Sequence, residues 1–375
     1  MTRSPHVLYG LPHSLYTGPA RAYLRKQGIA YVERTPRSEP FARDILPVIG
    51  RSIIPVMVTP EGEIVQDSVD IIDHFEANGA ASLSAYPPGP RQTFVALLLQ
   101  LYGNQGLLRA AMHYRWTYYD QQARFLDHAF AAGAPLEAVQ NVMRRMQSYL
   151  PGLGVTPETI PLIEQGFEDL LDILDAHFSV HPYLLGAIPS LGDYGLLGPL
   201  FAHLGRDPVP ADIMKRRAPA VFRWVERMNA PDLDITDLPD ASGWVEDDGV
   251  PETLEPLIAH MGQEMGPELA DKVAFLAEHV RRIAPKDGDP VSAKPHQRTI
   301  GTTPSTYRGV PAEVGVQPYL LYLVGRVRRQ LETMGADDRA WALDLLGRHG
   351  LRPAFDGELG VAVDRRNHIE VWAVA

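Results

Sequence analysis

Short apolar runs and helix-like runs alternate along roughly the first eighty residues. The run at residues 6–10 reads as a buried strand, and the segment after it keeps Ala20 and Leu24 on one face until Gly28 interrupts the pattern. Residues 29–34 then alternate between apolar and polar positions, as a half-buried strand does. Strand, helix and strand in this order predict a βαβ unit with a parallel pair of strands.

A second set of elements follows an irregular, charged stretch at residues 35–50. The runs IIPVMVT and EGEIVQD are separated by turn residues at 60–62, which predicts a hairpin, and SVDIIDHFEANG predicts a helix after it. The proline-rich segment AYPPGPR at residues 85–91 cannot continue a helix and predicts a semi-rigid linker.

From Phe94 onward the pattern is helical. A long periodic run that is mostly free of proline extends to about residue 130, and further helices fit residues 158–178, 193–204 and 217–229. The region after the linker is therefore expected to be an all-helical domain.

The last part of the chain has a different pattern. Residues 230–250 are acidic and rich in turn formers, which predicts an exposed connection. Two amphipathic helices are expected near 251–282 and 317–334, and the stretch between them at 287–311 has no periodicity and predicts a long loop. Two strand-like runs follow, LGVAVDRR and HIEVWAVA, joined at residues 366–367.

Length and composition limit the classes of protein to consider. The chain has 375 residues, enough for two or three domains, and its 45% hydrophobic and 22% charged residues are typical of a soluble folded protein. The formal net charge of -11 argues against a nucleic-acid partner and against an anionic membrane surface. No apolar run is long enough to cross a bilayer, and residues 1–10 lack the apolar segment of a secretory signal, so we expect a cytoplasmic protein.

The absence of cysteine restricts the chemistry further. It excludes a disulfide scaffold, a cysteine nucleophile and a thiolate metal site. The 13 histidines show no HExxH or paired metal spacing, so we also expect no bound metal. Any sulfur chemistry must therefore come from a ligand.

The turn between the first strand and the first helix, LPHSLYTGPARAYL, contains Ser14 and Thr17. A hydroxyl at the start of a helix commonly caps backbone N–H groups. The same hydroxyl can hydrogen-bond a thiolate, and the positive end of the helix favours ionisation of a thiol that is bound there. The residues alone leave both readings open for Ser14, and Thr17 is near enough to serve in either role.

Four features together resemble the glutathione transferases over roughly residues 5–235. HVLYGLPHSLYT stands where the family has its first strand and catalytic loop, IIPV matches its cis-proline segment, VQDS its glutamyl-binding motif, and PSLGDYGLL the capping box of a C-terminal-domain helix. The resemblance implies an α/β thioredoxin-like N-terminal domain at residues 1–84 and an all-α C-terminal domain at residues 85–235. Residues 236–375 then form an additional α+β extension of unknown role.

The register of the resemblance implies a Ser-type, bacterial member of the family. Ser14 is then the catalytic residue, because its hydroxyl falls where Ser-type members hydrogen-bond the sulfur of glutathione, and Thr17 is the alternative donor. The glutathione-binding residues that the resemblance implies are Thr17, Arg51, Ile54, Pro55, Gln66, Asp67 and Ser68.

Each of these positions has an expected role. A cis peptide bond before Pro55 would turn the backbone of Ile54 towards the cysteinyl part of the ligand. Ser68 and the first amides of its helix would bind the glutamyl carboxylate, although Ser68 also suits a plain helix cap, and Asp67 would pair with the glutamyl amine. Arg51 is the candidate for the glycyl carboxylate. Asp67 is one methylene shorter than the more usual Glu, so glutathione need not be the ligand.

The long helical run carries a polar and aromatic cluster that includes Arg109, His113 and Tyr114. In the geometry of the family these residues would face the cleft and bind an electrophilic substrate. An aromatic stripe at helical spacing is more often part of a core, so this second interpretation is kept beside the first.

The resemblance implies an enzyme that activates the thiol of glutathione, its co-substrate, for attack on a small electrophilic molecule. It also implies a homodimer, unless the extension covers the dimer surface. The alternative is a non-catalytic binding or assembly module that keeps the transferase fold and uses the extension as its working surface.

Overall fold

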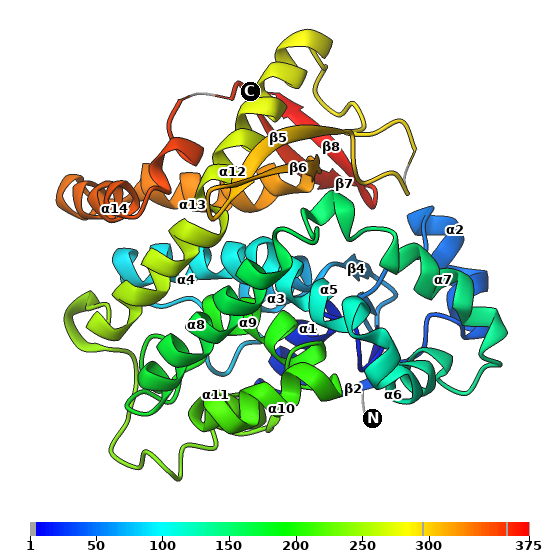
Figure 1. The fold of residues 1–375 in the computed structure, drawn as a ribbon, viewed down its shortest axis with the longest axis horizontal. Helices are drawn as coiled ribbons and strands as arrows, with labels where there is room; N and C mark the ends of the chain where they lie inside the picture. Colours follow the sequence, from blue (N-terminus) through cyan, green and yellow to red (C-terminus); the bar gives the residue numbers. More distant parts are fainter. Residues whose placement is uncertain (1–4, 295, 358, 375) are drawn as a thin grey trace.

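The N-terminal part of the chain folds into a four-stranded sheet with helices packed on it (Figure 1). The computed structural model of the protein describes residues 5–294, 296–357 and 359–374. The elements of this part are β1 (His6–Tyr9), α1 (Thr17–Lys26), β2 (Tyr31–Arg34), β3 (Val56–Val58), β4 (Ile64–Gln66) and α3 (Ser68–Ala77). The strand order is β2-β1-β3-β4, with β1 and β2 parallel and the other pairs antiparallel. The predicted βαβ unit and hairpin are therefore confirmed.

The two faces of this sheet are buried differently. Leu8 and Met57 join the main hydrophobic core together with α1 and α3. Their neighbours Tyr9 and Val56 point to the opposite face, because successive side chains of a strand alternate, and form a small separate cluster there.

The stretch at 35–50 is more ordered than expected. It contains the π-helical turn η1 (Phe41–Ile45) and the short helix α2 (Leu46–Ile49), which cover the Tyr9 face of the sheet. The charged residues between the apolar ones hid this helical spacing. Gly50 ends α2 with a positive φ of 67°, a conformation that glycine adopts without strain.

The second part of the chain is all helical, as predicted. Its helices are α4 (Pro90–Leu101), the π-helical turn η2 (Tyr102–Gly106), α5 (Leu108–Thr117), α6 (Tyr119–Ala131), α7 (Glu137–Gln147), the 3₁₀ turn η3 (Pro151–Leu153), α8 (Ile160–Phe178), α9 (Leu191–Ala202), α10 (Pro208–Arg217) and α11 (Pro219–Asn229). The run that looked continuous to about residue 130 is interrupted at η2 and at Tyr118, and α7 and α10 were not predicted.

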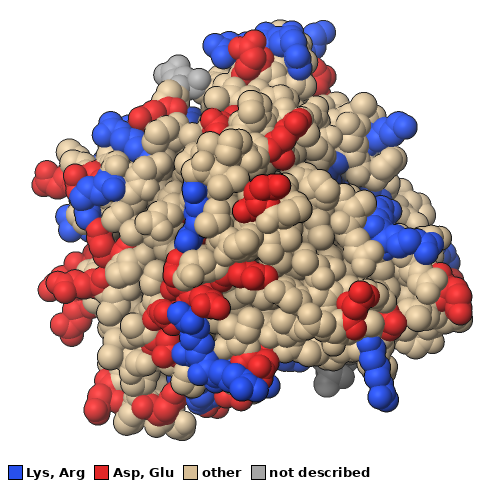
Figure 2. All heavy atoms as spheres, in the orientation of Figure 1, with Lys and Arg blue, Asp and Glu red and all other residues tan. Residues whose placement is uncertain are grey.

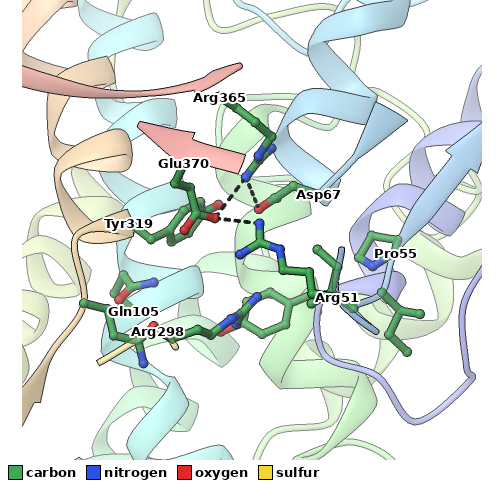
Figure 3. A pocket seen from close by; sticks show the side chains of 12 residues that line it. Arg51, Pro55, Asp67, Gln105, Arg298, Tyr319, Arg365 and Glu370 are labelled. Atoms are coloured by element: carbon green, nitrogen blue, oxygen red, sulfur yellow. Dashed lines mark hydrogen bonds and ion pairs between the residues drawn. The ribbon is translucent and has the colours of Figure 1, made fainter. Parts of the chain in front are cut away.

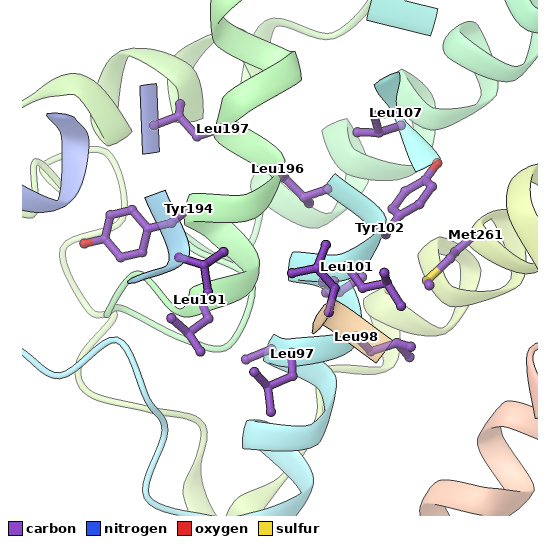
Figure 4. Packing of buried hydrophobic residues seen from close by; sticks show 14 of the residues in the cluster. Leu97, Leu98, Leu101, Tyr102, Leu107, Leu191, Tyr194, Leu196, Leu197 and Met261 are labelled. Carbon is purple, nitrogen blue, oxygen red and sulfur yellow. The ribbon is translucent and has the colours of Figure 1, made fainter. Parts of the chain in front are cut away.

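A close helix contact lies beside the interruption at η2 (Figure 4). A Cβ atom built on Gly103 would lie 2.3 Å from the carbonyl carbon of Gly195 in α9. One built on Gly195 would lie 2.6 Å from Cα of Gln100. The two backbones can therefore approach this closely only because both positions are glycine.

The predicted capping box at the start of α9 is confirmed. The Asp193 carboxylate accepts a hydrogen bond of 2.9 Å from the backbone N–H of Ser190, and the Ser190 hydroxyl accepts one from Asp193 N. Asp193 also accepts from the Nε1–H of Trp224, so the cap ties α9 to α11.

The third part of the chain contains helices and two hairpins. Its elements are the 3₁₀ turns η4 (Glu246–Asp248) and η5 (Glu252–Leu254), α12 (Glu255–Ile283), β5 (Gly301–Tyr307), β6 (Val310–Val316), α13 (Tyr319–Thr333), α14 (Ala336–Arg348), the 3₁₀ turn η6 (Arg352–Ala354), β7 (Val361–Arg366) and β8 (Ile369–Val374). The two predicted helices and the final strand pair are present, whereas α14 was not predicted.

The expected loop at 287–311 was wrong in its second half, where β5 pairs with β6. Thr303 and Ser305 point to the buried side of β5, so the alternation that marks a strand is absent from the pattern of apolar residues. The turn consists of Arg308 and Gly309, both at positive φ, as in a two-residue type I′ hairpin.

The largest of the hydrophobic clusters among the described residues contains side chains from all three parts. Met261 of α12 lies in the same buried cluster as Leu98 of α4 and Leu191 of α9, and Figure 4 shows Met261 facing the α4–η2 segment. Acidic and basic side chains are interspersed over the face shown in Figure 2. Within the described residues, no helix combines the length and the apolar character that a membrane span requires.

Candidate functional site

The candidate site is a pocket where the sheet domain, η2 and the C-terminal part meet (Figure 3). Four of the predicted ligand-binding residues line it: Arg51, Ile54, Pro55 and Asp67. About 30 Å³ is open between the lining side chains, room for roughly two water molecules. The pocket is therefore almost filled by the protein itself.

The Ile54–Pro55 peptide bond is cis, which confirms the expectation for Pro55. The backbone N–H of Asp67 donates to the carbonyl oxygen of Pro55 over 3.1 Å, so these two residues are held side by side. Asp67 has a positive φ of 81°, and its carboxylate accepts from Val69 N at the start of α3. One edge of this carboxylate thus caps the helix while the other faces the pocket.

Arg51 follows Gly50 directly and is almost fully buried at the pocket wall. Its guanidinium forms an ion pair with Glu370 of β8 at 3.0 Å. The residue that was expected to bind the glycyl carboxylate of a ligand therefore binds a carboxylate of the chain.

Gln66 and Ser68 are buried beside the pocket and are not among its lining residues. The Gln66 side-chain amide donates to the backbone carbonyl of His368 over 2.7 Å. Gln66 thus also binds the C-terminal hairpin.

Ser14 lies at the start of α1, outside the pocket lining. Its hydroxyl oxygen accepts a hydrogen bond of 3.2 Å from the backbone N–H of Thr17, so the capping contact is formed. The hydroxyl proton is still available for donation, because this contact uses only the oxygen as acceptor. The lining residue at this corner is Tyr16, which the sequence analysis missed.

Thr17 is not brought to the pocket. It is fully buried, and a Cβ atom on Gly10 would lie 2.2 Å from its Cγ2. Thr17 therefore packs on the end of β1, and only a movement of the helix start would let it contact a ligand.

The three residues predicted to bind an electrophile are also away from the pocket. Arg109 donates to the carbonyl of Leu153 over 2.7 Å and is paired with Glu268 of α12. His113 is fully buried and bonded to Glu164, and Tyr114 is buried in the main core. The core interpretation of this aromatic stripe fits their surroundings. The lining residue from this region is Gln105 of η2.

The remaining wall of the pocket comes from the C-terminal part, and no sequence signal located it there. It consists of Arg298, Gln317, Tyr319, Arg365 and Glu370. Arg365 and Glu370 are paired directly across the β7–β8 hairpin, a pairing that the two strand-like runs could have suggested.

Arg365 is the centre of the charged network in the pocket. Its guanidinium lies 3.3 Å from the Asp67 carboxylate and 3.6 Å from that of Glu370, and it donates to the backbone carbonyl of Gln66 over 3.0 Å. It also pairs with Asp70 of α3, whose pKa burial raises to about 6 although Arg365 acts in the opposite direction.

The charges around the pocket are nearly balanced. Three arginines and two carboxylates line it, and the Asp70 carboxylate behind the wall pairs with Arg365. Burial raises the pKa of Tyr16, against the effect of Arg298 and together with that of Asp67, so the Tyr16 hydroxyl stays protonated at neutral pH and can donate. Among the described residues, no group of three or more His, Asp or Glu side chains is arranged to hold a metal ion.

Comparisons with known proteins bear mainly on the N-terminal part. The family model for the glutathione S-transferase N-terminal domain matches residues 8–82. No curated protein sequence matches the chain.

Several solved structures resemble the chain at low identity. Glutathione transferase GSTFuA3 from Phanerochaete chrysosporium is 16% identical with a TM-score of 0.45, over 62% of this chain and 98% of that chain. A GST-like protein from Pseudomonas syringae is 17% identical with a TM-score of 0.42, over 84% of this chain and 96% of that chain. FzlA from C. crescentus is 16% identical with a TM-score of 0.35, over 62% of this chain and 100% of that chain.

The matched segment 8–82 contains the whole sheet except the start of β1, together with the cis-proline and Asp67. The helical domain and the C-terminal helices and hairpins follow it. The chain therefore combines a thioredoxin-like domain of the glutathione S-transferase type with a helical domain and an additional C-terminal part.

Proposed function

We propose that the protein is a glutathione transferase-like enzyme that binds glutathione over the Ile54–Pro55 turn and activates its thiol. The observation that carries the proposal is the arrangement of opposite charges around this cis turn, with Arg51 and Asp67 on the wall of one pocket. Glutathione carries an amine, two carboxylates and a thiol, and this arrangement suits such a ligand.

Each part of the ligand has a partner in this proposal. The Asp67 carboxylate takes the glutamyl amine, and the Arg51 guanidinium takes the glycyl carboxylate. The amides at the start of α3 and the Ser68 hydroxyl take the glutamyl carboxylate, since a helix N-terminus favours an anion. The backbone of Ile54 pairs with the cysteinyl residue in the manner of an added strand.

The chemistry then takes place at the start of α1. A free thiol has a pKa of about 8.5, and the positive helix end together with a hydrogen bond from the Ser14 hydroxyl lowers it. The thiol proton passes to water, and the thiolate sulfur bonds to an electrophilic carbon held against the Tyr16 and Gln105 side of the pocket, while that carbon releases a leaving group with its bonding electrons or, in an addition, its π bond opens.

Calorimetric titration with reduced glutathione, up to millimolar concentration, tests the binding. It is run on the wild type, on Ser14→Ala and on Ser148→Ala, a control at an exposed serine of the helical domain. Saturable binding is expected in all three proteins. The proposal would be contradicted if no protein bound glutathione at millimolar concentration, including a variant in which the contacts of the β7–β8 hairpin with the site have been removed.

Turnover of a panel of electrophiles tests the role of Ser14. Loss of a hydrogen bond that stabilises the reacting anion typically lowers kcat by about 10²-fold or more, whereas affinity for glutathione is expected to change by no more than about twofold. Equal losses in glutathione affinity and in turnover would show that the Ser14 hydroxyl does not stabilise the thiolate.

A second candidate function is the non-catalytic module. It is favoured by a specific observation, because Arg51, Gln66 and Asp67 all contact the C-terminal hairpin. Saturable glutathione binding without turnover of any electrophile would favour this second function.

A further inference from the structure

We propose that the β7–β8 hairpin is an internal ligand of the glutathione site, which competes with glutathione for Arg51 and Asp67. The inference rests on the proposed function, because it uses the ligand groups assigned there. Its subject is the pair Arg365 and Glu370, which no part of the sequence analysis had placed in the site.

The cation of the hairpin takes the place assigned to the glutamyl amine. The Arg365 guanidinium lies 3.3 Å from Asp67 and donates to the backbone carbonyl of Gln66, at the junction of β4 and α3. It also pairs with Asp70 one turn further along α3. An ammonium group bound to Asp67 would have to displace this guanidinium.

The anion of the hairpin takes the place assigned to the glycyl carboxylate. Glu370 lies 3.0 Å from Arg51, and its side chain is only 14% exposed. Figure 3 shows Glu370 and Arg365 converging on Arg51 and Asp67 from the same side. Because Arg365 and Glu370 are direct partners across the hairpin, one rigid element presents both charges.

The backbone of the hairpin tip adds a third contact. Asn367 and His368 form the turn, both at positive φ, and the His368 carbonyl accepts from the Gln66 side chain over 2.7 Å. The end of β4, at Gln66, is thus contacted by both side-chain and main-chain groups of the hairpin.

Space excludes simultaneous occupation. The site retains about 30 Å³, whereas pockets for small-molecule ligands are usually about 300 Å³ or larger. Glutathione can therefore enter only when the tip of the hairpin moves away.

The hairpin is anchored at its other end, so its tip can leave without unfolding of the chain. Trp372 is buried. Its backbone N–H donates to the backbone carbonyl of Asp289, and its backbone carbonyl accepts from the backbone N–H of Gly288, each over 2.9 Å. Val363 and Val371 are buried beside it. The anchor reaches as far as Glu370, whose backbone carbonyl accepts from Val291 N over 3.1 Å, so the part that leaves is the turn at 366–369 with the side chains of Arg365 and Glu370.

The experiment compares three full-length proteins: the wild type, the double variant R365Q/E370Q, and the control R366Q. The double variant removes both charges; glutamine matches glutamate in size and is shorter than arginine. Arg366 lies on the same hairpin and pairs with Asp287 and Asp364 outside the site, so it is a matched control. Glutathione affinity is measured by calorimetry, and amide hydrogen exchange is measured over residues 361–374.

The double variant is expected to bind glutathione at least about tenfold more tightly than the wild type, because a site that is open less than a tenth of the time loses that factor in apparent affinity. Its hairpin amides are expected to exchange at least about tenfold faster. R366Q is expected to match the wild type in both measurements. Glutathione added to the wild type at about 10 mM should also speed amide exchange at the hairpin. This measurement needs no variant.

The outcomes separate the two proposals. Equal glutathione affinity in all three proteins, with unchanged hairpin exchange on adding ligand, would overturn the competition and leave the proposed function standing. Faster hairpin exchange in R365Q/E370Q without glutathione binding in any protein would instead overturn the proposed function. Loss of cooperative thermal unfolding in the double variant would shift the decision to the wild-type exchange measurement, where an unchanged hairpin overturns the inference.

Discussion

His177 lies on the buried face of α8 with both ring nitrogens in use. Nδ1 lies 2.7 Å from the Thr253 hydroxyl, and Nε2 lies 3.3 Å from the carbonyl oxygen of Tyr183. The carbonyl can only accept, so Nε2 carries the proton and Nδ1 accepts from Thr253. Burial lowers the pKa of this histidine to about 3, so it stays neutral in the folded protein.

This neutral histidine makes stability depend on pH. In the unfolded chain its pKa is 6.5, so below pH 6.5 the unfolded state binds a proton that the folded state does not. Its contribution to stability is therefore lost as pH falls from 6.5 towards 3, at about 1.4 kcal/mol per pH unit. Urea unfolding at pH 7 and pH 5 should show the advantage of the wild type over His177→Gln shrinking by about 2 kcal/mol.

The control for this prediction is His128→Gln, at an exposed histidine of α6. The change measured for this variant between the two pH values is subtracted from the change measured for His177→Gln. A corrected difference for His177→Gln that stays constant would show that His177 titrates alike in the folded and unfolded chains.

Single residues also show what the sequence could predict about the site. The cis bond before Pro55 was predicted correctly because it depends on a local segment, whereas the residue that caps α3 is Asp67 and not Ser68, one position later, where a cap was expected. Arg365 and Glu370 could not be found in this way. Their cross-strand pairing is local, but the contacts of Arg365 with Asp67 and of Glu370 with Arg51 join positions about 300 residues apart, which no short pattern encodes.

At the scale of elements, the contact between α4, η2 and α9 sets how closely the helices approach. Gly195 faces the backbone of Gln100, and Gly103 faces the backbone of Gly195. Backbone atoms cannot rotate aside as a side chain does, so an added methyl group must separate the two helices.

Gly195→Ala should therefore destabilise the protein by about 2 kcal/mol, although alanine is normally the better residue inside a helix. Gly152→Ala is the matched control, because a Cβ there meets nothing within 4 Å. The control should change the free energy of unfolding by less than about 0.5 kcal/mol in the same denaturant titration. A neutral or stabilising Gly195→Ala would contradict the close packing.

The elements that sequence patterns predicted best were those with continuous apolar periodicity, such as α8, α12 and α13. The β5–β6 hairpin was missed because its inward positions include Thr303 and Ser305. The predicted continuous helix failed at η2, where the chain packs closely on α9, nearly a hundred residues later in the sequence, and no short pattern encodes such a contact.

At the scale of the whole molecule, the C-terminal part belongs to the main core. Leu257, Ile258 and Met261 of α12 are fully buried in the cluster that contains α4 and α9. Arg326 of α13 pairs with Asp73 of α3, so polar contacts also join the first and third parts.

A chain truncated after residue 235 should therefore fail to form a stable monomer. Removal of the helices after residue 235 exposes apolar side chains of α4 that are fully buried in the intact protein, such as Phe94, which packs against Trp341 of α14. The expected result is aggregation or a loss of cooperative unfolding, measured by size-exclusion chromatography and urea titration. A soluble fragment with a single sharp transition would show that the first two parts fold without the third.

The hairpin belongs to the same chain as the site it occupies, and this covalent connection sets the concentration that a competing ligand must reach. A tethered group acts as if it were present at an effective concentration in the millimolar range or above. A free ligand at micromolar levels therefore competes poorly unless its own contacts are much stronger than those of Arg365 and Glu370. The protein would respond to an abundant metabolite and ignore a scarce one, and the strength of the two ion pairs at the hairpin tip would set that threshold.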